Sequence, residues 1–347
     1  MKYLSLFSGI GGFELGIQQA YENNEHAHIS KESEQEERTQ RGVGPSDLGG
    51  VLLHSGNRTT PLCIGYSEID KYAIATYQKH YPTHHNYGDI TKINADELPD
   101  FDLLVGGFPC QTFSIAGKRR GFEDTRGTLF FEIARILRDK QPTKFLLENV
   151  KGLLSHDNGQ TFRTIIATLD ELGYDLQWQV LNSKNHGVPQ NRERIFIVGH
   201  LRGTARPEVF PFNEQINKNT TVGKSAETTV ARTLTGGGHS GGDHSGMTIL
   251  TKGMLSDEKW DRFNDSARRV YDPEGIAPTL PTVAGGGHTP KIDEGEMRIR
   301  RLTPTECERL QGFPDGWTAG VSDTQRYKQC GNAVTVNVIK DIVERLL

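Results

Sequence analysis

The sequence lacks the features of a membrane protein or a disulfide-rich secreted protein. No apolar run approaches the ~20 residues that a membrane-spanning helix needs. The first residues, Tyr3 to Phe7, are strand-like and lack the basic, then apolar pattern of a signal sequence. Only four cysteines occur in 347 residues, and their scattered positions have no metal-ligand spacing. We therefore expect free thiols in a reducing cytoplasm, no zinc site and no membrane association.

A large excess of charge of one sign is also lacking. The chain has 44 acidic and 40 basic residues, a formal net charge of −4. This excludes a generally basic coat for nucleic acid but leaves room for a local basic groove, because patches of charge contact phosphate. With 35% hydrophobic and 24% charged residues, the chain is predicted to be globular and to hold two domains.

The first part of the chain predicts strands that alternate with helices. Residues 2–23 predict a strand, a glycine turn and a helix, so that bare backbone at Gly9 and Gly11 can approach a ligand; a simple tight connection is the alternative. A second strand at 62–66 precedes Glu68, which is placed to accept hydrogen bonds from a ribose, unless it is only a solvated neighbour of a helix-capping Asp70. Residues 88–90 are predicted to close another short strand, with Asp89 on the same edge.

Residues 24 to about 60 interrupt this alternation. They are rich in charge, Ser, Gln and Gly and show little apolar periodicity, which predicts an exposed insertion without chemistry. A long surface loop is favoured, and an exposed accessory helix around Lys31–Arg41 is the alternative.

The rest of the chain is organised around GGFPCQTFS (106–114). The strand Phe101–Val105 leads in, and Pro109 keeps the approach to Cys110 extended, so a thiol is placed at the carboxyl end of a strand. Most free cysteines are small buried hydrophobes, and this remains the alternative. The following loop carries cations that could close as a lid on phosphates or simply be solvated: Lys118, Arg119, Arg120 and Arg126.

Further strands bring an acid and two arginines to the same edge. The strand 145–147 leads to Glu148, whose burial would raise its pKa and keep it protonated. Helices are predicted at 128–139 and 159–172, and a strand at 174–181. Arg192 and Arg194 stand at alternate positions before the strand IFIVGH, so both can point the same way.

The composition changes at residues 200–300, which are rich in glycine and have few long periodic stretches. This predicts a small separate domain of mostly short strands and loops. Two similar segments, ARTLTGGGHS (231–240) and APTLPTVAGGGHT (277–289), are either hairpins or a duplicated contact loop. Thr303 then begins a helix with a capping box to Glu306, and QCGNAV (329–334) is predicted to open the final helix, 335–347.

Taken in this order, the motifs resemble those of the DNA (cytosine-5)-methyltransferases of bacteria and their phages. They are LFSGIGGFELG, SEIDKYA, GDI, GGFPCQTFS, ENV, QNRERIFIVG, RLTPTECERLQGFP and QCGNAV. Only 24–60 and 200–300 are unmatched. The resemblance implies an α/β, Rossmann-like S-adenosylmethionine-dependent methyltransferase domain at 1–199, completed by 301–347. It also implies a small, mostly β and loop target-recognition domain at 200–300.

The resemblance assigns catalytic roles to four residues. Cys110 would add to C6 of a flipped-out cytosine, and protonated Glu148 would bind its N3 and exocyclic amine. Arg194, with Arg192, would bind the base and orient the thiol.

The resemblance also implies residues for the cofactor and for DNA. S-adenosylmethionine would contact Phe7, Gly9, Gly11, Glu68, Ile69, Asp89, Ile90, Pro109 and Asn332. Ile69 and Ala333 depart from the aromatic and the serine that are frequent in the family. Double-stranded DNA would contact Gln111, Ser114, Lys118, Arg119, Arg126, Thr279 and His288. Of the two repeated segments, the one with Thr279 is favoured as the target contact.

The expected setting is a monomer in the bacterial cytoplasm, with a cognate restriction endonuclease as a candidate partner. A transfer-RNA cytosine methyltransferase and a DNA-binding protein without catalysis are the rival functions. The long 200–300 region disfavours the first, and the intact Cys110, Glu148 and Arg194 disfavour the second.

Overall fold

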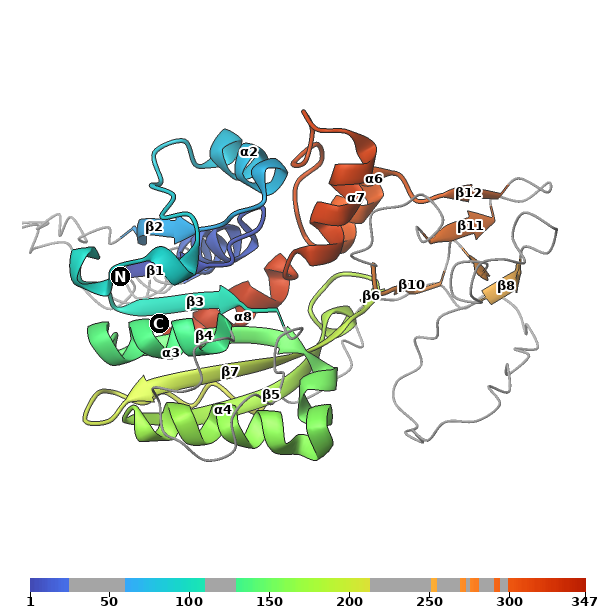
Figure 1. The fold of residues 1–347 in the computed structure, drawn as a ribbon. Helices are drawn as coiled ribbons and strands as arrows, with labels where there is room; N and C mark the ends of the chain where they lie inside the picture. The colour runs from blue at the N-terminus through green and yellow to red at the C-terminus, as the bar shows by residue number, and fades with distance from the viewer. Residues whose placement is uncertain are drawn as a thin grey trace, which may run out of the picture.

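A six-stranded sheet forms the centre of the molecule (Figure 1). The computed structural model describes residues 1–24, 60–109, 129–212, 251–254, 269–272, 275–280, 290–293 and 299–347. The strand order is β2-β1-β3-β4-β7-β5. The bounds are β1 Lys2–Leu6, β2 Leu62–Ser67, β3 Leu103–Gly107, β4 Lys144–Val150, β5 Tyr174–Asn182 and β7 Glu193–Leu201.

The direction of each strand decides which residues meet at one edge. β1, β2, β3 and β4 are parallel, so their carboxyl ends lie together, whereas β7 is antiparallel to β4 and β5. The amino end of β7, which carries Arg194 and directly follows Arg192, therefore reaches the same edge. The chain also switches sides between β1 and β3, and open α/β sheets bind their ligands at such a point.

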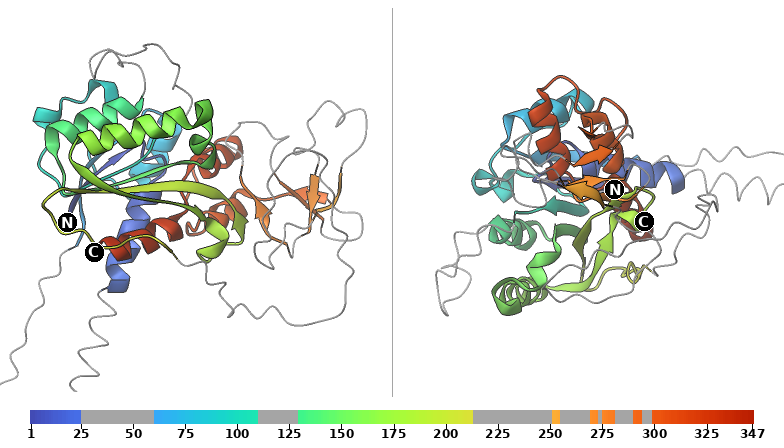
Figure 2. Two further views of the ribbon diagram at one scale, coloured as in Figure 1. Left: turned by 90° about the horizontal axis from the view of Figure 1, so that it is seen from below. Right: turned by 90° about the vertical axis from the view of Figure 1, so that its right-hand side faces the viewer.

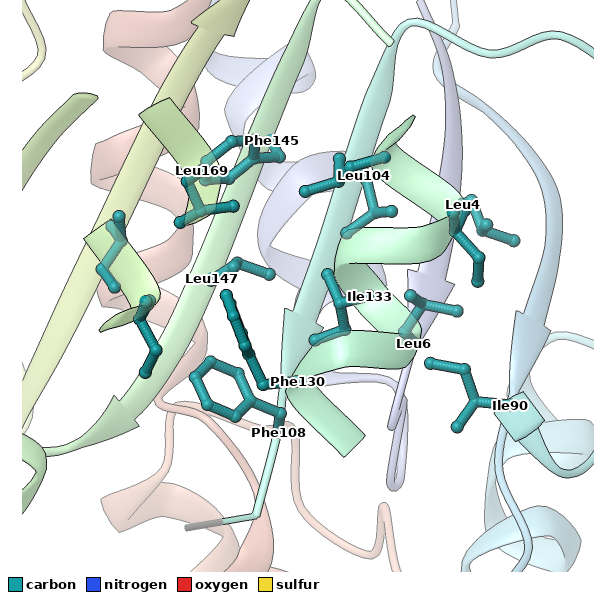
Figure 3. Packing of buried hydrophobic residues seen from close by; sticks show 14 of the residues in the cluster. Leu4, Leu6, Ile90, Leu104, Phe108, Phe130, Ile133, Phe145, Leu147 and Leu169 are labelled. Carbon is teal, nitrogen blue, oxygen red and sulfur yellow. The ribbon is translucent and has the colours of Figure 1, made fainter. Parts of the chain in front are cut away.

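Helices cover both faces of the sheet (Figure 2). On one face, α3 (Leu129–Lys140) and α4 (Gln160–Glu171) pack on Leu104, Leu147 and Ile197 in the cluster of Figure 3. On the other face, the helix of residues 12–24 and α8 (Val336–Leu346) pack on the alternate strand residues Leu103, Leu146 and Phe196. This alternation follows from the pleat of the strands and confirms the predicted α/β class.

Shorter elements complete this part, and their ends follow local sequence signals. Asp70 caps α2 (Lys71–His80) by accepting hydrogen bonds from Tyr72 N and Ala73 N. Thr303 and Glu306 form the predicted capping box of α6 (Pro304–Leu310). The remaining elements are η1 Ile90–Lys92, η2 Ala95–Glu97, η3 Lys151–Leu154, η4 His156–Gly159, η5 Ser183–Asn185 and α7 Asp323–Asn332.

The described parts of 251–301 form short strands, as the sequence predicted. β8 (Thr251–Met254), β9 (Arg269–Tyr271), β11 (Lys291–Asp293) and β12 (Ile299–Arg301) make a four-stranded sheet in the order β12-β11-β9-β8. β10 (Ala277–Pro278) instead pairs with β6 (Gln190–Asn191), between the two sheets in Figure 1.

Most predicted elements shift by one or two residues at their ends, as β3 does, and three predictions differ by more. Residues 88–90 are not a strand, because Gly88 has a φ of 71° and Asp89 caps η1. Residues 329–332 end α7 and do not open the final helix, which begins separately as α8. Residues 207–212 lie along β5, where the Gln177 and Gln179 side chains hold Val209 N and Phe212 N, although the sequence placed them in the second domain. Within the described residues, no helix is long and apolar enough to cross a bilayer.

Candidate active site

The chain leaves β3 toward Cys110 through Phe108, which is held in place, and Pro109. Phe108 is buried, and its ring centroid lies 5.7 Å from that of Phe130 at the start of α3 (Figure 3). Asn149 Nδ2 donates to the Phe108 carbonyl oxygen at 2.9 Å. Pro109, the last described residue before the thiol, is exposed. The predicted residues Cys110, Gln111, Ser114, Lys118, Arg119 and Arg126 lie outside the described residues.

The side chain of Glu148, near the end of β4, is largely shielded from solvent. By alternation its side chain lies on the face of the sheet that Leu146 shares with α8. The neighbouring strand has Gly107 there, and a Cβ on Gly107 would lie only 3.1 Å from Glu148 Oε2. The Glu148 side chain is 11% exposed, and Arg194 Nε lies 3.1 Å from its Oε1.

Burial raises the pKa of Glu148, and the charges of Arg194 and Arg192 offset only part of that rise. The raised pKa confirms the electrostatic expectation from the sequence. The carboxyl group is therefore easier to keep protonated than an exposed glutamate, and a protonated carboxyl can donate a hydrogen bond.

The strand register brings Arg194 to Glu148. Phe196 is opposite Glu148 and Arg194 is opposite Val150, so Arg194 is diagonal to the acid on one face of the antiparallel pair. Arg194 Nη1 also donates to its neighbour's carbonyl, Glu193 O, at 2.8 Å. The guanidinium is thus oriented beside the carboxyl group at the shared edge.

Arg192 is placed differently from Arg194. It is 2% exposed, and its Nη2 donates to Gly331 O at 3.1 Å and Ala333 O at 2.9 Å. Its Nε and Nη1 have no hydrogen-bond partner in the described part of the chain. Burial lowers its pKa to about 9, so Arg192 is still a cation at neutral pH. Arg192 therefore acts on Glu148 through its charge, and it also fastens the turn that follows α7.

The glycine loop after β1 has an unusual backbone that its sequence permits. Phe7, Gly9 and Gly11 have φ of 54°, 56° and 90°. A Cβ on Gly11 would lie 2.7 Å from Tyr81 Cε2, so no larger residue fits there without movement. A non-glycine residue such as Phe7 in this region is uncommon, and backbone strain of this kind concentrates at functional sites.

Glu68 ties the glycine loop to the end of β2. Its Oε2 accepts a hydrogen bond from Gly9 N at 2.9 Å, and its Oε1 accepts from Ile69 N and Asp70 N, each at 2.8 Å. Since each carboxylate oxygen can accept two hydrogen bonds, Oε2 retains capacity for one more donor. Ile69 beside it is 74% exposed, which leaves an apolar side chain free to contact a ligand.

Asp89 is held as a carboxylate on the same side. Its Oδ1 accepts hydrogen bonds from Thr91 N at 3.0 Å and Thr91 Oγ1 at 2.8 Å, and these bonds lower its pKa. Its Oδ2 accepts no hydrogen bond from the described residues. Ile90, the next residue, is buried. Asp89 is thus positioned by the cap of η1 and not, as the sequence had predicted, by the end of a strand.

The C-terminal segment closes the other side of the glycine loop. Trp317 Nε1 donates to Ile10 O at 2.9 Å, and Lys328 Nζ lies 2.6 Å from Asp70 Oδ2 at the start of α2. Asn332 is exposed at the end of α7. Hydrogen bonds and an ion pair therefore connect the glycine loop, the end of β2 and the C-terminal segment. These three segments carry the predicted residues Phe7, Gly9, Gly11, Glu68 and Asn332.

Thr279 is the described member of the predicted recognition pair, and His288 lies outside the described residues. The Thr279 hydroxyl donates to Asn191 O at 2.7 Å. It therefore contacts the segment that carries the arginines.

Sequence reasoning missed three positioning residues: Asn149, Gly107 and Trp317. Asn149 and Gly107 stand inside the motifs ENV and GGFPCQTFS that the sequence singled out. Their closeness in the chain to Glu148 and Cys110 was the available sign that they help to position these residues. The Trp317 contact with Ile10 joins residues too distant in the chain for any local pattern to indicate.

Comparisons with known proteins agree with this geometry. A family model of C-5 cytosine-specific DNA methylases matches residues 48–347. The type II methyltransferase M1.ScrFI of Lactococcus lactis subsp. cremoris is 43% identical over 301 residues, which cover 86% of this chain and 76% of that protein. The type II methyltransferase M.HhaI of Haemophilus parahaemolyticus is 36% identical over 367 residues, with 99% and 93% covered.

Among solved structures, the Dnmt2 methyltransferase of S. pombe shares the fold, with a TM-score of 0.66 at 18% identity over 100% of this chain and 98% of that chain. The match across most of the sequence and the identity to type II enzymes lead to one conclusion: the chain belongs to the C-5 cytosine-specific DNA methylase family and is a DNA (cytosine-5-)-methyltransferase.

Proposed function

We propose that this enzyme transfers the methyl group of S-adenosylmethionine to C5 of a cytosine flipped out of a specific duplex DNA sequence. It acts as a monomer in the bacterial cytoplasm, within a restriction–modification system that includes a cognate endonuclease. The observation that carries the proposal is the Glu148–Arg194 pair, which lies next to the strand end that leads to Cys110.

Each residue has a defined task in this chemistry. Cys110 adds as a thiolate to C6, and this makes C5 nucleophilic. Glu148, protonated, donates to N3 and accepts from the exocyclic amine, which stabilises the charge that develops on the ring. Arg194 orients the carboxyl group and the base. Once C5 has taken the methyl group, loss of the C5 proton and of the Cys110 sulfur releases 5-methylcytosine. The base must leave the duplex, because neither face of C6 is accessible inside the stack.

The residues around the glycine loop fit S-adenosylmethionine, which supplies the electrophilic methyl group when bound. The free capacity of Glu68 Oε2 suits a ribose hydroxyl, and Asp89 Oδ2 suits the adenine amine. Exposed Ile69 and half-buried Phe7 offer apolar contact to the adenine, and exposed Asn332 offers an amide to the methionine part. The region 200–300 selects the target, because it is the one large part of the chain outside the shared motifs.

A covalent trap tests the proposal. Duplex DNA that carries 5-fluorocytosine at the target should bind the wild-type enzyme covalently when S-adenosylmethionine is present, since fluorine cannot leave as the proton does. Cys110→Ala should form no adduct and transfer no labelled methyl group to duplex DNA, yet bind the cofactor. Cys63→Ala is the matched control and should form the adduct. Methylation by Cys110→Ala, or preferential methylation of transfer RNA, would refute the proposal.

A further inference from the structure

Gln190 is a fully buried polar residue with no role in the chemistry above. Its Oε1 accepts a hydrogen bond from Leu280 N at 3.2 Å, and its Nε2 donates to Leu310 O at 2.7 Å. Leu280 belongs to the region that we propose selects the target, and Leu310 ends α6. One amide side chain therefore joins the recognition region, the C-terminal segment and its own strand, β6.

The backbone around Gln190 repeats the same connection. β10 pairs in parallel with β6, Ala277 N donates to Pro189 O at 2.9 Å, and the Thr279 hydroxyl donates to Asn191 O at 2.7 Å. We call this contact between residues 189–191 and 277–280 the β6–β10 junction; Figure 1 shows it between the two sheets. Residues 281–289, with the second glycine-rich segment, follow the junction directly in the chain.

The other side of the junction leads to the acid. Arg192 N donates to Gln190 O at 3.0 Å. The backbone conformation at Gln190 therefore affects the position of the Arg192 backbone. Arg192 fastens the turn after α7, and Arg194 pairs with Glu148 at 3.1 Å. A shift of the junction would therefore move both arginines relative to the carboxyl group.

We propose that Gln190 is a positioning residue that couples target contact to catalysis. It holds residues 277–280, which precede residues 281–289 in the chain, in register with the segment 190–194 that carries the two arginines. A correctly docked target then favours the productive placement of Arg194 on Glu148, and a wrong sequence does not. This inference rests on the proposed role of region 200–300 in target choice.

The first test is Gln190→Leu, which keeps the approximate volume but removes both side-chain hydrogen bonds. We expect kcat on target duplex to fall about tenfold, the scale of one or two buried hydrogen bonds. The rate on non-target duplex should fall much less, because it gains little from the junction. We define discrimination as the ratio of kcat/KM on target duplex to kcat/KM on non-target duplex. This ratio should fall about tenfold, as kcat on target duplex does, while cofactor affinity is unchanged.

Gln190→Glu supplies a rescue that depends on pH. A protonated carboxyl can donate to Leu310 O and accept from Leu280 N as the amide does, whereas a carboxylate would face the Leu310 carbonyl without a proton. Burial favours the protonated form. Relative to wild type at each pH, discrimination by this variant should approach wild type as the pH falls and decline as it rises. The same ratio for Gln190→Leu should stay flat.

Gln311→Leu is the matched control. Gln311 is equally buried and also makes two side-chain hydrogen bonds, to Cys330 O at 2.6 Å and from Thr335 Oγ1 at 2.9 Å, and neither bond joins it to residues 277–280. Its variant should lose stability and keep discrimination. The inference is overturned if Gln190→Leu discriminates as wild type does, if Gln311→Leu loses discrimination equally, or if Gln190→Glu discriminates as poorly as Gln190→Leu at every pH. A wild-type enzyme without any discrimination between duplexes would instead refute the proposed function.

Discussion

Replacing Glu148 by Gln tests both the chemistry and the charge state of this residue. The amide has nearly the same shape, so the space beside Gly107 remains filled. It cannot share a proton with the cytosine ring, and the loss of a positioned acid slows reactions by roughly 10²-fold or more. We expect that reduction in single-turnover methyl transfer with labelled S-adenosylmethionine, with a much smaller change in DNA affinity.

The pH dependence of stability follows from the raised pKa. Because burial raises the pKa of Glu148 in the folded state, the folded protein binds this proton more tightly than the unfolded chain. The wild-type free energy of unfolding therefore includes a contribution that is full at acid pH and is lost as the pH rises through the folded pKa. Each unit of raised pKa corresponds to about 1.4 kcal/mol. Glu148→Gln lacks this titration, so its stability relative to wild type should improve as the pH rises.

Glu308→Gln is the control with the opposite sign. Glu308 is also buried and lies 3.1 Å from Arg326 Nη2. Burial pushes its pKa up, but hydrogen bonds from Thr318, Arg326 and Gly316 N outweigh burial and lower it. Its contribution is present above the ordinary glutamate pKa and is lost as the pH falls, so Glu308→Gln should be most destabilising near neutral pH.

Denaturant unfolding of the three proteins at several pH values provides the measurement. If Glu148→Gln follows the same trend as Glu308→Gln, the arginines hold Glu148 as a carboxylate, and its role as a proton donor is refuted. A single-turnover rate within a few-fold of wild type would also remove Glu148 from the mechanism.

Three further predictions concern parts around the site. Asn149→Ala removes the bond to Phe108 O and should lower kcat about tenfold or more by misplacing the approach to Cys110, with cofactor affinity retained in a titration. Trp317→Phe keeps an aromatic ring but loses the bond to Ile10 O, so the cofactor Kd should rise about fivefold while kcat at saturating cofactor is kept; an unchanged Kd would contradict this. Replacing Glu25–Thr59, which lies outside the described residues, by a short Gly-Ser linker should preserve solubility and methylation, since long surface insertions add little closure entropy; insoluble or inactive protein would show that the segment packs on the core.

Local patterns predicted the elements well where a signal lies within a few residues. The Asp70 cap, the capping box of Thr303 and the strands at 62–66 and 174–181 all appear where the sequence placed them. Prediction was wrong at residues 88–90, where the left-handed Gly88 and the capping Asp89 make a turn. It was also wrong for 329–332, since the break between α7 and α8 depends on distant partners such as Arg192, which holds Gly331 O and Ala333 O.

The sequence by itself determined the order of chemical groups and the strand ends that carry them, because alternation, glycine turns and capping are properties of short segments. It also determined that Glu148 would be buried with a raised pKa, since three apolar residues precede it. Only the tertiary structure decided that Arg194 lies on Glu148 while Arg192 turns to the end of α7. It likewise decided that Gln190 joins two distant segments. These outcomes depend on the reversal of β7 against β4 and on the pairing of β6 with β10. Both contacts join residues far apart in the chain, so packing of the whole fold sets them and no local pattern does.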